Sequence, residues 1–217
     1  MASPSRSQAA EPAAASRTAP VTTLSEDDLS SAAQRDRRKR ILDATMALAS
    51  KGGYDAVQMR AVAERADVAV GTLYRYFPSK VHLLVSALAR EFEQFESKRK
   101  PLPGDTPQER MHLMLQQVTR AMQRDPLLTE AMTRAFMFAD ASAAAEVDRV
   151  GKVMDRFFAR ALAEDTPTDR QLAIARVISD VWMSNLVAWL TRRASATDVT
   201  ERLELTVDLL IGDGKQP

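Results

Sequence analysis

The segment from Gly71 to Lys80 (GTLYRYFPSK) constrains the fold of this 217-residue chain more than any other part of the sequence. On a helix with 3.6 residues per turn, Leu73 and Phe77 share the face that turns inward, whereas Tyr74 and Arg75 lie on the opposite face. A glycine inside a helix lowers the stability of the helix by roughly 1 kcal/mol relative to alanine. Gly71 therefore suggests that a large partner comes close to the backbone. The segment therefore predicts a helix that docks through one face and presents the other face to a partner.

A second helix is predicted directly upstream, over residues 57–66, where Met59, Val62 and Ala66 form one apolar stripe. The short turn Asp67-Val68 separates the two helices. This is the spacing of a helix-turn-helix, in which the second helix enters the major groove of DNA and the first crosses the backbone. An ordinary helical hairpin is the alternative, but it leaves the glycine and the cluster of Tyr, Arg and Lys unexplained.

The distribution of charge also favours DNA as the partner. The whole chain has a net charge of only +1, but residues 31–80 contain ten Lys or Arg and five Asp or Glu, a net charge of +5 that leaves −4 for the remainder. A locally basic module on an acidic body is typical of a DNA-binding domain rather than of a general polycation. The basic run at residues 35–40 is either a solvated helix start or a contact to the DNA backbone or minor groove, and we favour the contact.

Helix start and stop signals recur from Ser31 onward, without strand-like alternation. Gly52 and Gly53 predict the end of the first helix, and the run Thr106-Pro107-Gln108-Glu109 predicts a capping box with proline at the first helical position. We therefore expect an all-α fold of about nine helices. They are expected over residues 33–51, 57–66, 71–80, from 79 to a linker at 98–104, 107–123, 126–139, 143–163, 168–193 and 197–212.

These signals divide the chain into a tail, a DNA-binding domain, a connecting helix and a body. The tail, residues 1–30, is rich in Ala, Ser and Pro and has no continuous apolar core, so it is expected to be disordered and not a signal peptide. The helix-turn-helix domain is expected at residues 31–78 and the connecting helix at 79–100. The body, residues 101–217, is expected to bind a ligand and to form the dimer.

An enzyme is not expected from this sequence. There is no cysteine, which excludes disulfides, thiolate catalysis and cysteine-ligated metals and makes a reducing cytoplasm the natural compartment. His82 and His112 have no metal-ligand or catalytic partner at a recognisable spacing, and the seven glycines form no phosphate-binding loop. No metal and no cofactor is expected. A DNA-architectural protein would also be basic and helical, but it would not need so large a Met-rich body.

The predicted helix at residues 168–193 is apolar nearly all round. Between Leu172 and Leu190 only five of 19 residues are not apolar, and these include Arg176 and Asp180. Ionisable residues are rare in membrane spans, so we expect a helix buried on two sides, one against its own domain and one against a second copy of the chain. With the last helix it would form a four-helix dimer interface. The expected interface residues are Val177, Val181, Ser184, Ala188, Trp189, Leu205 and Leu209.

Residues 58–84 resemble the helix-turn-helix of the TetR family of bacterial transcriptional regulators. The most specific letters are Gly71-Thr72-Leu73-Tyr74, Tyr76-Phe77 and Ser79-Lys80. The resemblance implies a TetR-like fold, with a three-helix DNA-binding domain and a helical ligand-binding and dimerisation domain. The family usually has glycine in the turn and serine as the cap of the recognition helix, where this chain has Asp67 and Ala69. Aspartate tolerates the left-handed conformation, but loss of a serine cap typically costs about 1 kcal/mol.

The stretches 34–89, 122–148 and 175–199 further resemble one subgroup of that family, the repressors of cholesterol catabolism in sterol-degrading actinobacteria. The last two stretches lie in the body, where the family otherwise shares little sequence. This resemblance implies a dimeric repressor of sterol-degradation genes that is released by a coenzyme A thioester of a cholesterol-derived acid. The alternative is a repressor of the same family that responds to a fatty acyl-CoA or a drug-like amphiphile.

The body contains many methionines and aromatic residues, which adapt to large apolar cavities but more often form plain core. The expected ligand-binding residues are Met111, Met114, Leu115, Val118, Met132, Phe136, Met137, Trp182 and Leu186. Arginines 110, 120, 124 and 134 could meet coenzyme A phosphates near a pocket mouth, although solvated arginines are commoner. Ligand would shift the helix at 126–139, and the connecting helix would carry the movement to the DNA-binding domain.

Two groups of residues are expected to contact double-stranded operator DNA. Those expected to position the dimer on phosphates are Arg37, Arg38, Arg40, Tyr74, Tyr76 and Lys80. Those expected at or near base edges are Gln58, Arg60, Val70, Thr72 and Arg75, with the backbone at Gly71. Arg75 to guanine is the most natural pairing. The protein is expected on the nucleoid in the cytoplasm, as a homodimer and without a membrane partner.

Overall fold

The computed structural model describes residues 31–97, 103–163 and 165–212, and the secondary structure of these residues is entirely helical. The all-α prediction is therefore confirmed, whereas the expected tail at 1–30 lies outside the described residues. The helices are α1 (Ala32–Ala56), α2 (Met59–Arg65), α3 (Val70–Tyr76), α4 (Lys80–Ser97), α5 (Pro107–Arg124), α6 (Pro126–Met137), the 3-10 helix η1 (Ala141–Ala143), α7 (Ala144–Leu162), α8 (Asp169–Leu190) and α9 (Ala196–Ile211).

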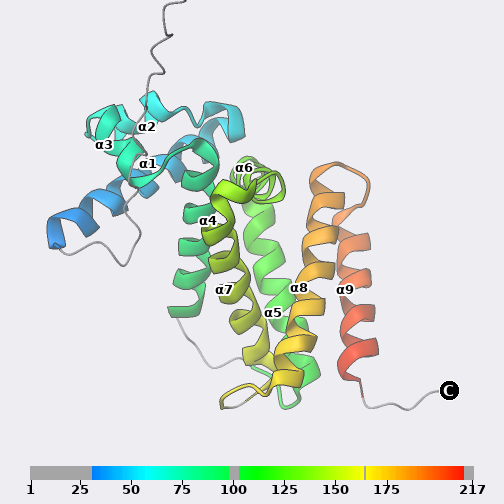
Figure 1. Ribbon diagram of the computed structural model, residues 1–217. Coiled ribbons are helices and arrows are strands. Elements are labelled where there is room, and N and C mark those ends of the chain that lie inside the picture. The colour runs from blue at the N-terminus through cyan, green and yellow to red at the C-terminus, as the bar shows by residue number, and fades with distance from the viewer. Residues whose placement is uncertain (1–30, 98–102, 164, 213–217) are drawn as a thin grey trace, which may run out of the picture.

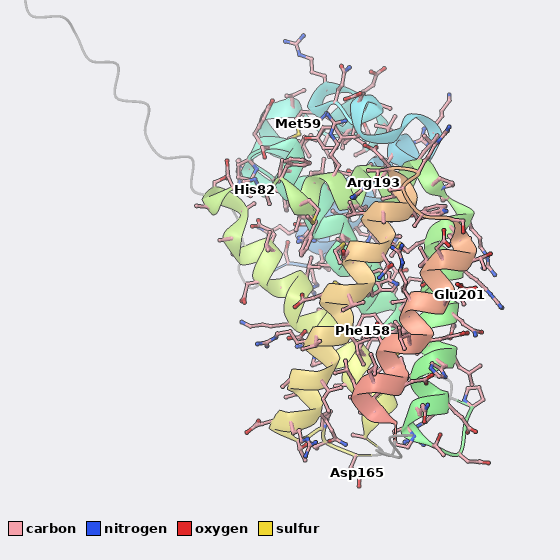
Figure 2. The ribbon with its side chains drawn as sticks, turned by 90° about the vertical axis from the view of Figure 1, so that its right-hand side faces the viewer. Met59, His82, Phe158, Asp165, Arg193 and Glu201 are labelled. Atoms are coloured by element: carbon pink, nitrogen blue, oxygen red, sulfur yellow. The ribbon has the colours of Figure 1, made fainter. Side chains whose placement is uncertain are left out.

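The helices form a small N-terminal group, α1 to α3, and a taller bundle, α5 to α9, with α4 reaching from one to the other (Figure 1). In the bundle α7 packs against α4, α5 and α8, and α9 packs against α5 and α8. The most extensive contact between the two parts joins α1 to α6. Figure 2 shows Met59 of α2 at one end of the molecule, Phe158 within the bundle and Asp165 at the far end. The DNA-binding group therefore sits on one end of the bundle.

The helix ends follow the predicted capping chemistry. The Thr106 hydroxyl accepts a hydrogen bond from Glu109 N, and the Glu109 carboxylate accepts from Thr106 N, which confirms the capping box at the start of α5. The regular path of α1 breaks at Gly52 and Gly53, where Gly53 has a φ of +67° that favours glycine. Residues Tyr54 to Ala56 then form a short helical turn beyond the break.

The predicted recognition helix over residues 71–80 is wrong at its C-terminal end. Helix α3 ends at Tyr76, Phe77 is extended with φ −142° and ψ 106°, and Lys80 begins α4. The physical reason is Pro78, because proline disfavours the helical conformation of the residue before it. The inward face is as predicted, since Leu73 and Phe77 are both buried.

Candidate DNA-binding surface and ligand core

The turn between α2 and α3 is held by the side chain of Arg40. Its Nη1 donates to the carbonyl oxygens of Ala66 and Asp67, the residues that follow α2. Asp67 has a φ of +53°, so it adopts the left-handed conformation expected at this position. Ala69 caps α3 without a side-chain hydrogen bond, as the sequence predicts. The Arg40 guanidinium binds the carbonyl oxygens at the end of α2 and thereby stabilises the turn. The start of α3 has no side-chain cap.

The outer face of the helix-turn-helix is open and polar. Tyr74 is 42 % exposed and Val70 37 %, and the other exposed candidates are Gln58, Arg60, Gly71 and Arg75. Thr72 is half-buried on the same helix. A Cβ added to Gly71 would meet no heavy atom within 4 Å, so nothing inside the described chain requires glycine here. The surface leaves room for a DNA backbone at this glycine, and it brings most of the expected base-edge residues onto one face.

Other expected phosphate contacts point into the protein instead. Tyr76 is buried, at 6 % exposed, and its ring lies 6.4 Å from that of Phe77. Arg38 stacks on the Phe77 ring with Cζ 5.1 Å from the centroid, and burial lowers the pKa of its guanidinium, although Glu93 opposes the shift. Arg37 is half-buried. A count of charges along the sequence could not reveal these inward orientations.

A cluster that we call the Tyr54 junction joins the DNA-binding group to the body. Lys80 Nζ of α4 donates to the Tyr54 carbonyl oxygen at 3.1 Å and lies 3.9 Å from the centroid of its ring. Arg134 of α6 lies over the same ring, with Cζ 4.4 Å from the centroid. Tyr54 N donates to the Glu130 carboxylate at 3.4 Å, and Arg134 lies 3.7 Å from Glu130. Three helices therefore meet at one aromatic ring through charge and π contacts.

Lys80 thus has an intramolecular partner where the sequence predicted a phosphate contact. Burial lowers the pKa of its ammonium, and the charge of Asp55 opposes that shift. The junction could not be predicted directly, because Lys80, Tyr54 and Arg134 are far apart along the chain. The one available signal was an aromatic residue directly after the Gly52-Gly53 break, a position where apolar contacts often accompany a helix end.

His82 makes a second bridge between the two parts. It is buried, and its Nδ1 lies 2.9 Å from Ser79 Oγ at the end of the helix-turn-helix. Its Nε2 lies 2.9 Å from the carbonyl oxygen of Ser142, in η1 between α6 and α7. This histidine has a structural role that links the start of α4 to the segment after α6. Among the described residues, no group of His, Asp and Glu is arranged to hold a metal ion.

The expected ligand-binding residues lie mostly in one buried core. Seven of the nine are 3 % exposed or less: Met111, Met114, Leu115, Val118, Met132, Trp182 and Leu186. Trp182 Nε1 donates to Thr119 Oγ1 at 3.0 Å, which satisfies the buried indole. Phe136 is half-buried, but Met137 is 52 % exposed at the end of α6, so it does not join the core.

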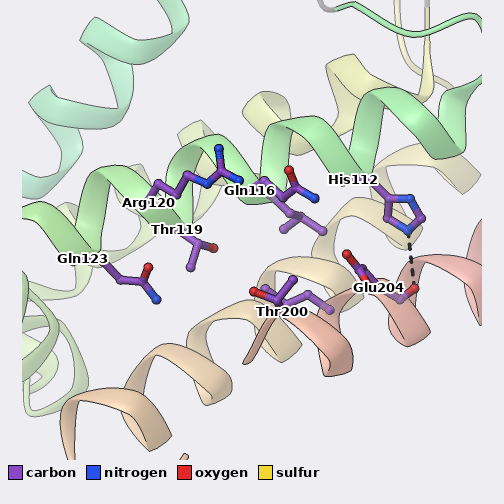
Figure 3. A pocket seen from close by; sticks show the side chains of 9 residues that line it. His112, Gln116, Thr119, Arg120, Gln123, Thr200 and Glu204 are labelled. Carbon is purple, nitrogen blue, oxygen red and sulfur yellow. Dashed lines mark hydrogen bonds between the residues drawn. The ribbon is translucent and has the colours of Figure 1, made fainter. Parts of the chain in front are cut away.

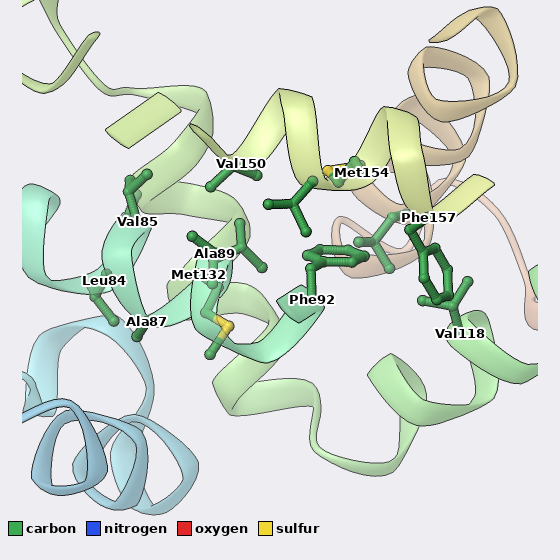
Figure 4. Packing of buried hydrophobic residues seen from close by; sticks show 14 of the residues in the cluster. Leu84, Val85, Ala87, Ala89, Phe92, Val118, Met132, Val150, Met154 and Phe157 are labelled. Carbon is green, nitrogen blue, oxygen red and sulfur yellow. The ribbon is translucent and has the colours of Figure 1, made fainter. Parts of the chain in front are cut away.

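The core is filled by its own side chains. Beside it, a pocket between α5 and α9 has a volume of only about 120 Å³, and Figure 3 shows Thr119 of α5 and Thr200 of α9 on its two walls. Figure 4 shows Met132, Val118 and Phe157 pointing toward the space around Phe92. Ligand pockets usually measure about 300–1,000 Å³, so this pocket is too small for a large amphiphile. A large ligand that entered the core through this pocket would have to separate α5 from α9.

The expected dimer surface lies on α8 and α9. Leu209 is 75 % exposed, and Leu205 and Val177 are also exposed apolar residues. Val181 and Trp189 are half-buried and Ser184 is exposed, whereas Ala188 is buried within the chain itself. By length and composition α8 could cross a membrane, but its Ile178 and Trp182 pack into the bundle and Arg176 pairs with Asp155 of α7 at 2.9 Å. Exposed apolar residues on two neighbouring helices are typical of an interaction site.

Two family models match the chain. The family described as "Bacterial regulatory proteins, tetR family" matches residues 41–87, and "Tetracyclin repressor-like, C-terminal domain" matches residues 104–210. The HTH-type transcriptional repressor KstR of Rhodococcus jostii (strain RHA1) is 78 % identical over 201 residues, which are 93 % of this chain and 95 % of that protein. The matched regions include both the helix-turn-helix and the body.

Solved structures show the same fold. A TetR transcriptional regulator from Rhodococcus sp. RHA1 superposes with a TM-score of 0.75 at 31 % identity, over 83 % of this chain and 98 % of that one. The transcriptional regulator FadR from Bacillus subtilis, solved in complex with stearoyl-CoA, has a TM-score of 0.58 at 19 % identity over 81 % of this chain and 98 % of that one.

Replacing Arg75 with alanine should weaken operator binding by about 1–3 kcal/mol, because the guanidinium that is expected to pair with a base edge is lost. Binding to random DNA of equal length should change much less. The measurement is fluorescence anisotropy with both DNAs at one fixed salt concentration. Equal losses on the two DNAs would show that Arg75 contacts only phosphate.

Replacing Leu209 with glutamate should shift the chain from dimer to monomer, because a carboxylate would lie in an apolar interface. The residue is largely exposed in the single chain, so the fold should stay intact. Sedimentation velocity and far-UV circular dichroism measure the two properties. Leu127→Glu, at an exposed position on α6, is the control; a Leu209→Glu protein that remains dimeric would remove this part of α9 from the interface.

Proposed function

This chain belongs to the TetR family of bacterial transcriptional regulators and is a DNA-binding repressor, and we propose that a coenzyme A thioester of a cholesterol-derived acid releases it from its operators. It is not an enzyme, and as a bacterial DNA-binding repressor it works in the cytoplasm. We also propose that the protein associates with the nucleoid. A dimer would bind a palindromic operator with its two α3 helices and would control genes of sterol and lipid degradation.

The residues proposed to read the operator lie on the exposed face of α2 and α3. Arg75, Tyr74 and Arg60 are exposed there and carry donors for base edges or phosphates. Three other cationic residues affect DNA binding mainly by stabilising the domain. Arg38 packs on Phe77, Arg40 binds the α2–α3 turn, and Lys80 binds Tyr54.

The observation that carries the proposed induction mechanism is the double role of α6. On one face Met132 is buried in the ligand core, and on another Glu130 and Arg134 contact Tyr54. A ligand that separates helices to enter the core must displace the face that carries Met132, and α6 then moves its contacts to α1 and α4. A ligand shifts the equilibrium only if it binds the DNA-incompetent arrangement more tightly.

Two observations support a thioester with a bulky apolar group. The core is aromatic and methionine-rich, and the ring of Phe92 lies 5.9 Å from that of Phe157 and 6.1 Å from that of Trp182 between centroids. The FadR regulator that shares the fold was solved with stearoyl-CoA. The stearoyl-CoA bound to that regulator also supports the second candidate, a fatty acyl-CoA as inducer, and both thioesters therefore belong in the same experiment.

The test is operator binding measured by fluorescence anisotropy at fixed salt, with titration of the thioester, the corresponding free acid, and stearoyl-CoA. We expect the cholesterol-derived thioester to weaken operator binding by 1–3 kcal/mol, the usual range of coupling free energies. The free acid and stearoyl-CoA should have little effect at the same concentration. Release by stearoyl-CoA alone would favour the second candidate and reject the sterol.

Replacing Tyr54 with leucine should reduce the coupling between ligand and DNA, because Lys80 and Arg134 lose the aromatic face that they share. Ligand binding itself, followed by tryptophan fluorescence, should persist, since Tyr54 is only half-buried and is not one of the expected ligand-binding residues. Tyr54→Phe keeps the ring and should restore coupling to the wild-type value. A Tyr54→Leu protein that the ligand releases as fully as wild type would exclude the junction from the path.

A further inference from the structure

A hollow on the outer side of α5, which we call the α5 groove, is not explained by DNA binding or by the dimer. Its volume is about 360 Å³, within the range of ligand pockets. It lies between α5, the end of α4 and Pro103, which precedes α5. The lining residues are Phe95, Pro103, Leu113, Gln116, Gln117, Arg120, Ala121 and Arg124.

The groove carries two arginines without partners. Arg120 and Arg124 lie one helical turn apart, both are exposed, and neither makes a hydrogen bond or ion pair with another described residue. The other two arginines considered at the sequence level are engaged, because Arg110 Nε donates to the Ala161 carbonyl oxygen and Arg134 pairs with Glu130. The structure therefore selects one pair from the four.

Acidic side chains near this pair are few and occupied elsewhere. The Asp125 carboxylate, next to Arg124, accepts from Leu128 N as the cap of α6. Glu204 lines the neighbouring α5–α9 pocket but not the groove. Two guanidiniums a turn apart without a neutralising carboxylate favour an anion with more than one phosphate group.

Phe95 of the groove also packs against the aromatic core. The ring of Phe95 lies 6.4 Å from that of Phe157, which in turn lies 5.9 Å from Phe92. Gln116 and Arg120 line both the groove and the α5–α9 pocket, so a polar surface with amide groups continues around α5 (Figure 3). A ligand with an apolar end in the core and an anionic end outside could pass Phe95.

We propose that the α5 groove binds the phosphorylated end of the thioester inducer, with Arg120 and Arg124 donating to its phosphate groups. The side-chain amides of Gln116 and Gln117 would pair with the amides of the pantetheine arm. The acyl group would enter the core beside Phe95. This inference rests on the proposed function, since it assigns one part of that ligand to one part of the body.

The test compares two thioesters of the same cholesterol-derived acid: the coenzyme A thioester and the pantetheine thioester, which keeps the amides of the arm but lacks the phosphates. Wild type should need at least ten-fold less of the coenzyme A thioester for half-release from the operator. Arg120→Gln/Arg124→Gln should lose most of that preference and respond to both thioesters alike. Glutamine keeps helix propensity at these exposed positions, so the fold should be retained.

The control is Arg170→Gln/Arg202→Gln, which removes two exposed arginines of α8 and α9 outside the groove and changes the net charge equally. It should keep the wild-type preference.

Equal potency of both thioesters on wild type, or an unchanged preference in the groove variant, would overturn the groove assignment but leave the proposed function intact. If neither thioester releases wild type, the proposed function fails, and calorimetry with desulfo-coenzyme A then tests the groove directly. Absence of binding there would overturn the groove as well.

Discussion

The uninterrupted burial of α4 constrains the rest of the structure. Every residue from His82 to Ala89 is buried, and Phe92 follows one turn later. The N-terminal half packs beneath the helix-turn-helix and the C-terminal half enters the aromatic core, so both parts of the molecule share one helix. Because protein interiors are close-packed and respond to strain by discrete shifts, neither end of α4 can rearrange without changing the packing of the other.

The fold was largely predictable from sequence because helix punctuation is local. Capping residues, glycine breaks and proline positions depend on neighbours within a few residues, and they placed the helix starts of the body correctly. The end of α3 was missed although its cause, Pro78, is equally local. There the apolar spacing of Leu73 and Phe77 continued past the proline, and the helical period alone could not show that the backbone had already turned.

The direction of long cationic side chains was not predictable, because it depends on contacts between distant segments. From the sequence alone, Arg38 and Lys80 are as suitable for contacting phosphate as Arg75 is. In the structure the first two lie over aromatic rings and only Arg75 faces outward. Long side chains bury their stems along apolar surface wherever a ring is available, so net charge located the DNA-binding module but not the contacts within it. The Tyr54 junction was missed for the same reason.

In the proposed mechanism, the α5 groove contributes to the affinity for the inducer, and the buried core contributes to the shift between the DNA-bound and released arrangements. A contact that is equally strong in the DNA-bound and released arrangements raises affinity but shifts no equilibrium. Arg120 and Arg124 are exposed and line the groove, and neither takes part in the contacts that join α6 to Tyr54, so in the proposed mechanism phosphate binding there contributes nearly equally to both arrangements. In the proposed mechanism the acyl group displaces Met132 and its neighbours, and this step distinguishes the two arrangements. Changes in the groove should therefore alter the concentration of thioester that is needed, whereas changes in the core or at Tyr54 should alter how completely the repressor leaves its operator.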